Sequence, residues 1–362
     1  MSIFVGPLLL ILLVGIELLV LKALNKPIPW AEVSMNLNSG QILLWLGRGL
    51  EVLGYYYLAT LIPYQLTDDL GFFWVLLIAF ILWDHQFYWL HNLHHKVPLL
   101  WYIHEVHHQG QHFNSSLGIR NSWFSSISSL PFFLPLVLVG IPVEVFVLVS
   151  SVHYFVQFYN HNDIIKHPKW MEKIFITPSL HKVHHGVNIE YLNKNCGGTF
   201  SIWDRIYGTH QQELEHVKVK LGIRKDFSTG SPILVNILPF LKSPRPNVKL
   251  NNNPLLNFAS FLLYIQLLSF IAIQEQLTIV SGTVFVVFIV LGTVTLGLIQ
   301  EGKRHGWSLW ILNLTASSLA MNYIDLFDFQ QVIASVIATI GYTSIVVFWN
   351  LSGRIKKGQS LF

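Results

Sequence analysis

The sequence predicts an all-α polytopic membrane protein of about nine transmembrane or re-entrant helices. Hydrophobic residues make up 52% of its 362 residues and charged residues only 12%, about half of the charged fraction of a soluble globular domain. Apolar runs of the ~20 residues that cross a bilayer recur along the chain. These runs lie at 3–21, 41–61, 72–90, 255–273, 279–299, 307–322 and 332–350.

A further apolar stretch at 129–158 is broken near Gly140, Pro142 and Glu144. Glycine and proline interrupt regular structure, so this stretch predicts a helical hairpin. The first run lacks a basic segment and a clear small-residue cleavage site, which favours a retained helix over a signal peptide. By composition, the chain divides into an N-terminal helix with a linker at 1–40, a histidine-containing unit at 41–240, a Pro/Asn-rich linker at 241–254 and a four-helix membrane module at 255–362.

The basic residues predict how the chain crosses the membrane, because cytoplasmic loops are enriched in Lys and Arg. Lys22 and Lys26 follow the first run, and Lys303 lies between two of the last runs. Connections without Lys or Arg lie at 62–71, 274–278 and 323–331. Alternation of the sides then places the N-terminus outside and residues 91–128 and 159–254 in the cytoplasm. We expect a multi-pass protein of the endoplasmic reticulum or the bacterial inner membrane.

Histidine is concentrated in one region, since 15 of the 17 histidines fall between His85 and His210. Three segments, "HNLHH", "HEVHH" and "HKVHH", share the pattern H-x-x-H-H. Residues three and four apart lie on one face of a helix, so we expect each box to offer two or three imidazoles to one point. The boxes contain His91, His94, His95, His104, His107, His108, His181, His184 and His185.

Such a number of imidazoles predicts a metal site. Imidazole binds zinc, copper, iron and nickel, and a single zinc needs only three or four ligands, so eight or nine histidines indicate two metal ions. The one cysteine, Cys196, excludes a cysteine-built zinc or iron–sulfur site. The sequence has no Gly-rich dinucleotide motif and no haem-attachment motif, so redox chemistry here would take its electrons from outside the chain.

Two other readings stay open at this point. "HEVHH" also satisfies H-E-x-x-H, in which His104 and His108 would hold zinc and Glu105 would be the general base of a metalloprotease. The other two boxes carry no Glu at the second position, so a protease would leave most histidines without a role. A non-catalytic metal-binding or transport protein is the second alternative, although a transporter is expected to place ionisable residues inside its spans.

Four segments, "DHQFYWLHNLHH", "HEVHH", "QFYNHNDII" and "TPSLHKVHHGVNIEYLNKNCGGTFSIWDRIYGT", resemble the fatty acid hydroxylase (sterol desaturase) superfamily. Its members hold a non-haem di-iron centre with boxes of the form H-x3-H, H-x2-H-H and H-x2-H-H. The "TPS-x-HKVHHG" run, the "WDR-x-YGT" ending and the span layout most resemble the alkylglycerol (glyceryl-ether) monooxygenases, a pterin-dependent group that cleaves glyceryl ethers. The resemblance covers about residues 40–215 by motif, so we expect a di-iron domain at 41–240.

This resemblance implies a membrane di-iron oxidoreductase that uses O2 to hydroxylate a lipid, and the basic residues predict that its histidine boxes face the cytoplasm. Ether-lipid cleavage is the first expectation, followed by hydroxylation or desaturation of a sterol or acyl chain. The implied partners are the lipid, O2 and an electron-donor protein, without nucleic acid. The implied cofactors are two iron ions, with tetrahydrobiopterin or another external reductant. The implied ligands are His91, His95, His104, His107, His108, His161, His181, His184 and His185.

The chain departs from the family pattern at three positions. Asn92 stands where an Arg is usual, His85 where an aromatic residue is usual, and Gln111 where the alkylglycerol monooxygenase-like sequences carry Glu. The change at Gln111 removes an acid close to the second box, which bears on the substrate and the reductant.

Five other polar residues receive expectations of their own. His94 is an extra histidine if the first box follows H-x3-H, although the spacing also allows His94 in place of His95 as the ligand. Asp84, at a helix end, is expected to orient a histidine or to meet water. Arg120 is expected to hold an anionic group or to lie in solvent, and Asp204 with Arg205 to form a structural pair or cap.

Overall fold

The computed structural model describes residues 5–323 except 40, 224–226, 242–243, 252–253 and 304. Within these residues the fold is all-helical, with two isolated β-bridges and no strand. The predicted run at 332–350 lies outside the described residues. The α-helices are α1 (Val5–Ala23), α2 (Trp30–Asn38), α3 (Gln41–Thr60), α4 (Phe72–Lys96), α5 (Pro98–His108), α6 (Ser125–Leu138), α7 (Val143–Tyr159), α8 (Pro178–His184), α9 (Ile202–Ile206), α10 (Pro232–Ile237), α11 (Pro254–Ile273), α12 (Ile279–Gln300) and α13 (His305–Tyr323). Short 3-10 turns lie at Leu66–Asp68, Ser115–Ile119, Met171–Lys173, Leu238–Phe240 and Gln274–Gln276.

Four of the described helices, α1, α4, α11 and α12, are long and apolar enough to cross a membrane. The predicted runs at 41–61 and 307–322 form the helices α3 and α13, which are not among these four. Polar side chains lower the apolar content of both helices, including Arg48 and Glu51 in α3. The count of nine passes therefore stays a prediction.

The predicted break in the stretch 129–158 is present, because α6 ends at Leu138 and α7 begins at Val143. Gly140 has a φ of +80°, a conformation that glycine adopts without steric cost. A Cβ atom at this position would lie 2.8 Å from the Tyr64 carbonyl oxygen. Glycine is therefore required at the turn between the two helices.

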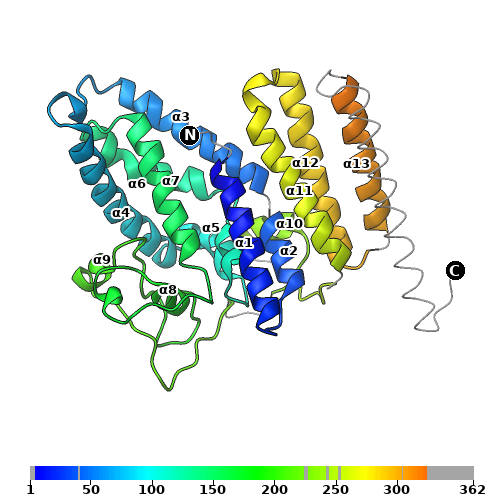
Figure 1. Cartoon of the computed structure of the whole chain (residues 1–362), viewed down its shortest axis with the longest axis horizontal. Helices are drawn as coiled ribbons and strands as arrows, with labels where there is room; N and C mark the ends of the chain where they lie inside the picture. Colours follow the sequence, from blue (N-terminus) through cyan, green and yellow to red (C-terminus); the bar gives the residue numbers. More distant parts are fainter. Residues whose placement is uncertain are drawn as a thin grey trace.

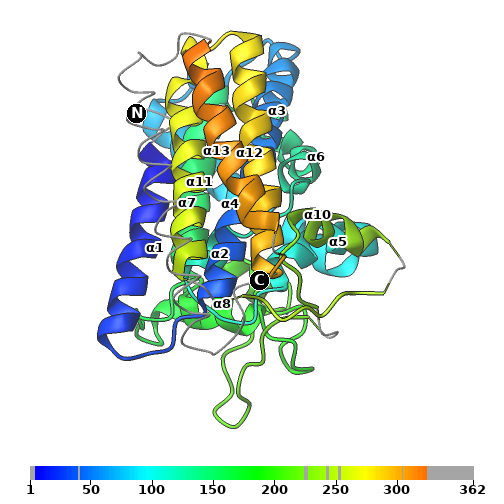
Figure 2. The ribbon, with the colours of Figure 1, turned by 90° about the vertical axis from the view of Figure 1, so that its right-hand side faces the viewer.

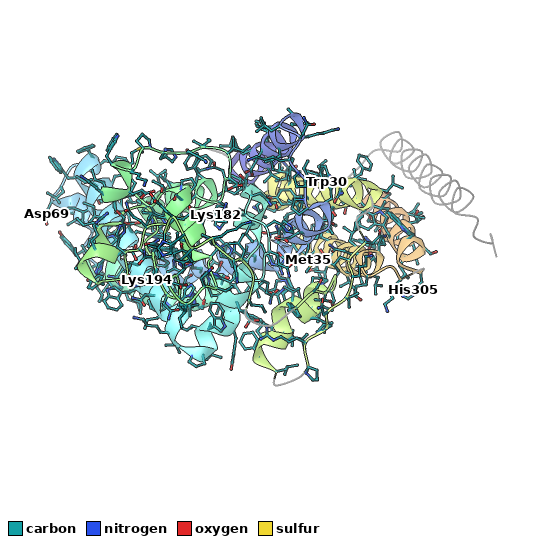
Figure 3. The ribbon with its side chains drawn as sticks, turned by 90° about the horizontal axis from the view of Figure 1, so that it is seen from below. Trp30, Met35, Asp69, Lys182, Lys194 and His305 are labelled. Atoms are coloured by element: carbon teal, nitrogen blue, oxygen red, sulfur yellow. The ribbon has the colours of Figure 1, made fainter. Side chains whose placement is uncertain are left out.

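The long helices form two groups that run side by side (Figures 1 and 2). One apolar core, with Trp83, Phe133 and Phe146, joins α3, α4, α6 and α7. A second core, with Leu263 and Trp310, joins α1 and α2 to α11, α12 and α13. The segment that follows α7, including α8 and α9, gathers at one end of the helices (Figure 1). Figure 3 looks at this end, where Lys182 and Lys194 lie apart from Trp30 and Met35.

Candidate metal centre

Helix boundaries bring the histidine boxes to the same end of the molecule. Val97 separates α4 from α5 and has extended backbone angles, φ −95° and ψ 119°. The following Pro98 explains them, because proline disfavours the helical conformation of the residue before it. The first box therefore ends α4, and the second box ends the next helix, α5.

The third box lies on α8, whose start is set by the "TPS" motif. The Thr177 side chain accepts a hydrogen bond from the Leu180 amide, at 3.4 Å, and Pro178 occupies the first helical turn. Threonine is a good N-cap and proline fits the first turn of a helix. His161 follows directly after α7 and its cap residue Asn160.

The structure brings the nine histidines named above into two groups, and the ligand atoms of each group lie within 4.8 Å of one another. His94 belongs to neither group, and its Nε2 lies 3.2 Å from the Ser128 hydroxyl. The first group is His91, His95, His104, His108 and His184, called here the five-histidine group. The second is His107, His161, His181 and His185, called the four-histidine group.

Each box offers two imidazoles to one group, as expected, but the second and third boxes each give their remaining imidazole to the other group. In the second box, His104 and His108 join the five-histidine group whereas His107 joins the four-histidine group. The third box divides in the same manner, because His184 joins the five-histidine group whereas His181 joins the four-histidine group. Residues i+3 and i+4 flank residue i on opposite sides and lie about 100° apart around the helix axis, so they can face different sites. A single H-x-x-H-H helix can therefore contribute to two adjacent sites.

Backbone carbonyl groups orient four of these rings. In each ring the Nδ1 atom lies close to one backbone carbonyl oxygen. The distances are 2.9 Å for His91 Nδ1 to Cys196 O, 2.8 Å for His107 Nδ1 to Arg120 O, 2.8 Å for His161 Nδ1 to Gln157 O and 2.8 Å for His184 Nδ1 to Lys194 O. A carbonyl oxygen only accepts, so Nδ1 must carry the single proton of the neutral ring. Nε2 therefore presents a lone pair to the centre of each group.

These lone pairs fit a bound cation. His107 Nε2 lies 3.0 Å from His161 Nε2, although two acceptors cannot hydrogen-bond to each other. Burial lowers the pKa of His107 to about 4 and that of His184 to about 3, so both rings are neutral near pH 7. His95 Nε2 is buried and has no hydrogen-bond partner among the described residues. Neutral imidazole is the donor that iron, zinc and copper accept, so both groups fit metal ions.

Two buried aspartates hold the loop that carries two of the orienting carbonyls. Asp84 accepts hydrogen bonds from Thr199 N at 2.7 Å and Trp203 Nε1 at 2.8 Å. Asp204 accepts from Cys196 N at 2.7 Å and Gly197 N at 2.9 Å. Both carboxylates therefore position the loop behind His91 and His184.

The expectations for these acids are met only in part. Asp84 does orient a histidine, but that residue is His153, whose Nε2 lies 2.5 Å from Asp84 Oδ1 and which belongs to neither group. Asp204 binds loop amides rather than Arg205, whose guanidinium donates to the Glu172 carbonyl oxygen at 3.1 Å. Burial raises the pKa of Asp204 to about 6.

Both expectations for Arg120 are wrong, since its side chain is buried and binds neutral groups of the chain itself. It donates to the Val106 carbonyl oxygen at 2.7 Å, to Gln109 Oε1 at 2.7 Å and to Asn36 Oδ1 at 3.3 Å. The positive charge thereby fixes the end of α5 next to His107, and it is directed neither to solvent nor to an external anion.

Glu105 points away from the histidines. Its two carboxylate oxygens bind the guanidinium of Arg245, which lies in the predicted linker, and the Nη2–Oε2 contact measures 3.0 Å. Neighbouring residues on a helix do not share a face. Because the histidines of α5 face the two histidine groups, the side chain of Glu105 points away from them. The H-E-x-x-H reading requires Glu105 beside the metal, and the structure does not place it there.

The three departures from the family pattern have local partners. Asn92 donates to the Tyr88 hydroxyl at 2.9 Å, and His85 Nε2 lies 2.9 Å from the Tyr207 hydroxyl. At position 111 the contact is made by the main chain, since the backbone N–H of Gln111 donates to Glu32 Oε1 at 2.9 Å. A carboxylate therefore lies at this turn although residue 111 is not acidic, and α2 supplies it.

Two aromatic residues that the sequence analysis did not single out cover the histidines. The Trp101 ring centroid lies 5.2 Å from that of His95 and 5.5 Å from that of His108. Phe113 covers the four-histidine group, with its centroid 5.7 Å from that of His185. No spacing marks these residues in the sequence, because each contacts the histidines through the fold.

Comparison with known proteins gives the family of this region. Residues 76–209 match the family model described as fatty acid hydroxylase. These residues form a fatty acid hydroxylase domain. All nine histidines of the two groups lie within the fatty acid hydroxylase domain, and the resemblance inferred from the motifs is confirmed.

Several curated relatives share this domain. Human alkylglycerol monooxygenase is 36% identical over 162 residues, which cover 45% of this chain and 36% of the human protein. The Xenopus tropicalis alkylglycerol monooxygenase is 32% identical over 221 residues, covering 58% and 48%. An ornithine lipid hydroxylase of Rhizobium tropici is 26% identical over 155 residues, covering 42% and 46%. The chain thus spans about a third to a half of the length of these relatives, and no solved structure matches it.

Proposed function

We propose that the fatty acid hydroxylase domain makes this chain a membrane-embedded oxidoreductase that hydroxylates a lipid with O2 and two iron ions. The observation that carries the proposal is the pair of adjacent histidine groups, with lone pairs directed inward by backbone carbonyls. The names of the relatives support a lipid substrate, and the identity to alkylglycerol monooxygenases favours an ether lipid. A sterol or an acyl chain is the next candidate, consistent with a match to human cholesterol 25-hydroxylase.

The five-histidine and four-histidine groups would each hold one iron. When bound, the two irons supply the activation of O2 and the oxidation of an unactivated C–H bond. The chain contributes the rest: carbonyl oxygens fix the rings of His91, His107 and His184, while Trp101 and Phe113 exclude water from the groups. Hydroxylation of the carbon beside an ether oxygen gives a hemiacetal, which separates into an aldehyde and glycerol.

The position of the site suits such a substrate. Both groups lie near the end of α4, a helix long and apolar enough to cross a membrane. A lipid in the adjacent leaflet would keep its alkyl chain among apolar side chains and its polar end at the interface. The distribution of basic residues supports a cytoplasmic location of this end.

Metal analysis and oxygen consumption test the proposal together. The full chain, purified in detergent, should contain about two irons and should consume O2 when an alkylglycerol and a reductant are both present. Tetrahydrobiopterin and a ferredoxin-type reductase system are compared as electron donors, with a sterol and a free fatty acid as alternative substrates. One zinc per chain without O2 consumption would contradict the proposal, as would iron that supports no lipid oxidation and so indicates a non-catalytic metal protein.

A further inference from the structure

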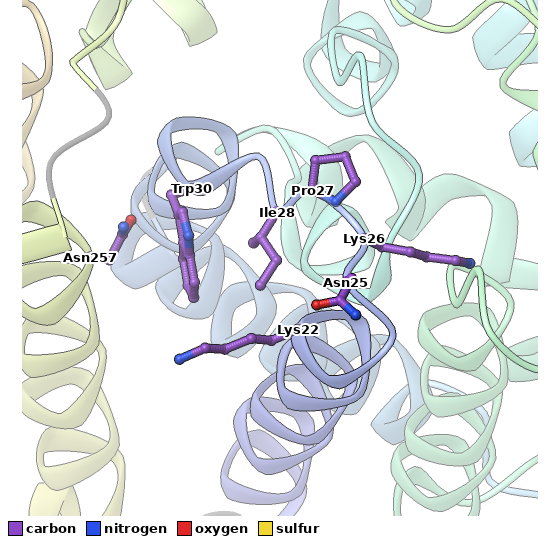
Figure 4. Close-up of a pocket in the computed structure, with 7 residues that line it drawn as sticks. All are labelled: Lys22, Asn25, Lys26, Pro27, Ile28, Trp30 and Asn257. Carbon is purple, nitrogen blue, oxygen red and sulfur yellow. The ribbon is translucent and has the colours of Figure 1, made fainter.

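An open pocket of about 600 Å³ lies where the end of α1 meets the beginning of α11 (Figure 4). None of the nine histidines lines it. The end of α1 contributes Lys22, Asn25 and Lys26, the approach to α2 contributes Ile28 and Trp30, and α11 contributes Asn257.

The backbone turn after α1 creates the basic side of this pocket. Asn25 has a φ of +54°, Lys26 N donates to the Leu21 carbonyl oxygen at 2.9 Å, and Asn25 N donates to that of Lys22 at 3.0 Å. This pattern is a Schellman ending, in which asparagine takes the left-handed position. The turn places Lys22 and Lys26 at the same end of the helix. Both are exposed, and in the described part of the chain neither forms an ion pair with a carboxylate.

Basic residues at the C-terminal end of a helix are favoured by its dipole, so the two lysines alone do not indicate a ligand. The evidence for a ligand comes from the opposite wall of the pocket. Asn257 is buried, and its Oδ1 has no hydrogen-bond partner among the described residues. A buried acceptor without a partner is unfavourable, and a bound hydroxyl or ammonium group would relieve this cost. Figure 4 shows Lys22 extending below Trp30 toward the Asn257 side, while Lys26 points the other way.

The pocket also lies at the ends of two candidate membrane-spanning helices. α1 and α11 are both long and apolar enough to cross a bilayer, and the pocket joins the last turn of one to the first turn of the other. On α1 the exposed residues Leu12, Ile16 and Leu19 lie on one face that leads toward this end. A molecule in the pocket would therefore meet an anion-binding side, a hydrogen-bond acceptor and an apolar helix face.

We propose that this pocket binds the headgroup of an anionic glycerophospholipid such as phosphatidylglycerol. The phosphodiester lies at Lys22, Lys26 adds positive charge at the other edge of the pocket, a headgroup hydroxyl donates to Asn257 Oδ1, and the acyl chains follow α1. The lining contains no carboxylate that would repel the phosphate. The site is separate from the metal centre, so it stands or falls independently of the proposed oxygenase activity.

The test measures binding of fluorescent short-chain phosphatidylglycerol to the full chain in detergent micelles. Phosphatidylcholine of the same chain length is the zwitterionic comparison, and soluble glycerol 3-phosphate competes as a free phosphate. The double variant Lys22→Ala with Lys26→Ala should bind phosphatidylglycerol about 25-fold more weakly, since each basic residue contributes about a factor of five at an anionic surface. Asn257→Leu, which keeps the size but removes the acceptor, should weaken binding several-fold.

A matched control removes the same charge elsewhere. Lys166 and Lys169 are exposed and lie outside the pocket, so Lys166→Ala with Lys169→Ala should leave binding unchanged. Lys22→Arg with Lys26→Arg should restore it, and melting temperatures confirm that each variant folds. Equal binding of the two lipids by the wild type would overturn the proposal. Equal losses of phosphatidylglycerol binding in the two alanine double variants would do so as well. So would competition by glycerol 3-phosphate at the concentration used for the lipid.

Discussion

Glu105 and Arg245 form a two-point ion pair that joins α5 to the segment before α11. Glu105 is only 3% exposed, and Arg245 also lies over the Phe227 ring at 5.7 Å. The pair holds the predicted linker against the helix that carries the second histidine box. The carboxylate of the H-E-x-x-H motif therefore has a structural partner on the side of α5 that faces away from the histidines.

Replacing Glu105 by Gln should leave the proposed oxygenation largely intact while lowering stability. The neutral amide keeps the size of the side chain but leaves Arg245 without a counter-charge, and we expect a loss of about 1–3 kcal/mol, since breaking a buried pair is costly and Arg245 keeps some access to water. The measurement is thermal unfolding together with iron content and lipid-dependent O2 consumption.

The double variant Glu105→Gln with Arg245→Met is the control for this effect. Removing both charges should recover part of the lost stability, because residues in contact give non-additive changes. A Glu105→Gln protein with full iron content but no activity would contradict the structural assignment and would return Glu105 to acid–base chemistry.

Replacing a histidine inside one of the two groups should have a larger effect than replacing a histidine outside them. His107→Ala should lower bound iron and abolish turnover, because it removes a donor from the four-histidine group. His94→Ala should retain most of both, since His94 lies 3.2 Å from Ser128 and outside the groups. Iron analysis and O2 consumption on the purified variants check this order. The opposite order would mean that the first box uses His94 as a ligand.

Asp204 should act on the metal centre without touching it. Asp204→Asn replaces one acceptor oxygen by an NH2 group, so the two amides of Cys196 and Gly197 no longer both have an acceptor. The Cys196 carbonyl that orients His91 would then shift. We expect iron affinity to fall by about 10–100-fold, the range typical of partners that orient metal ligands.

An iron titration followed by absorption measures this change directly, with the melting temperature recorded beside it. Glu215→Gln, at an exposed position, is the matched control and should bind iron as the wild type does. Unchanged iron affinity in Asp204→Asn would remove the loop from any role in orienting the histidines.

Local pattern predicts the elements of this fold well. The apolar run at 72–90 corresponds to α4, but the helix continues to Lys96, because the first histidine box is itself helical. The break at Gly140 and Pro142 is visible in the sequence, since these residues determine the turn by their own conformations. Metal binding by the nine histidines stays a prediction that the geometry supports.

The arrangement around the histidines depends on distant partners, which one sequence does not reveal. Arg245 lies 140 residues from Glu105 and in a Pro-rich segment that reads as a plain linker. Asp84 meets His153 from 69 residues away, and nothing in the spacing of either residue distinguishes this pair from a solvated acid and a lone histidine. The division of the second and third boxes between two groups likewise follows from how α4, α5 and α8 face one another.

Gly198 provides a test of how tightly the fatty acid hydroxylase domain packs behind the five-histidine group. A Cβ atom at this position would lie 2.1 Å from His153 Cε1 and 2.8 Å from Phe87 Cδ1. Phe87 in turn packs against the His91 ring, with the centroids 5.3 Å apart. Gly198→Ala should therefore destabilise the protein by about 1–3 kcal/mol, as overpacking of a dense core does, and should also reduce iron content.

Gly49 is the matched control for this substitution, because a Cβ atom there meets nothing within 4 Å. It lies inside α3, where alanine is favoured over glycine by roughly 0.5–1 kcal/mol, so Gly49→Ala should raise the melting temperature or leave it unchanged. Both variants are measured by thermal unfolding and iron analysis. The same chemical change is expected to lower stability at Gly198 and not at Gly49. If Gly198→Ala kept the wild-type melting temperature and iron content, the close packing of His153, Phe87 and His91 would be irrelevant to the metal centre.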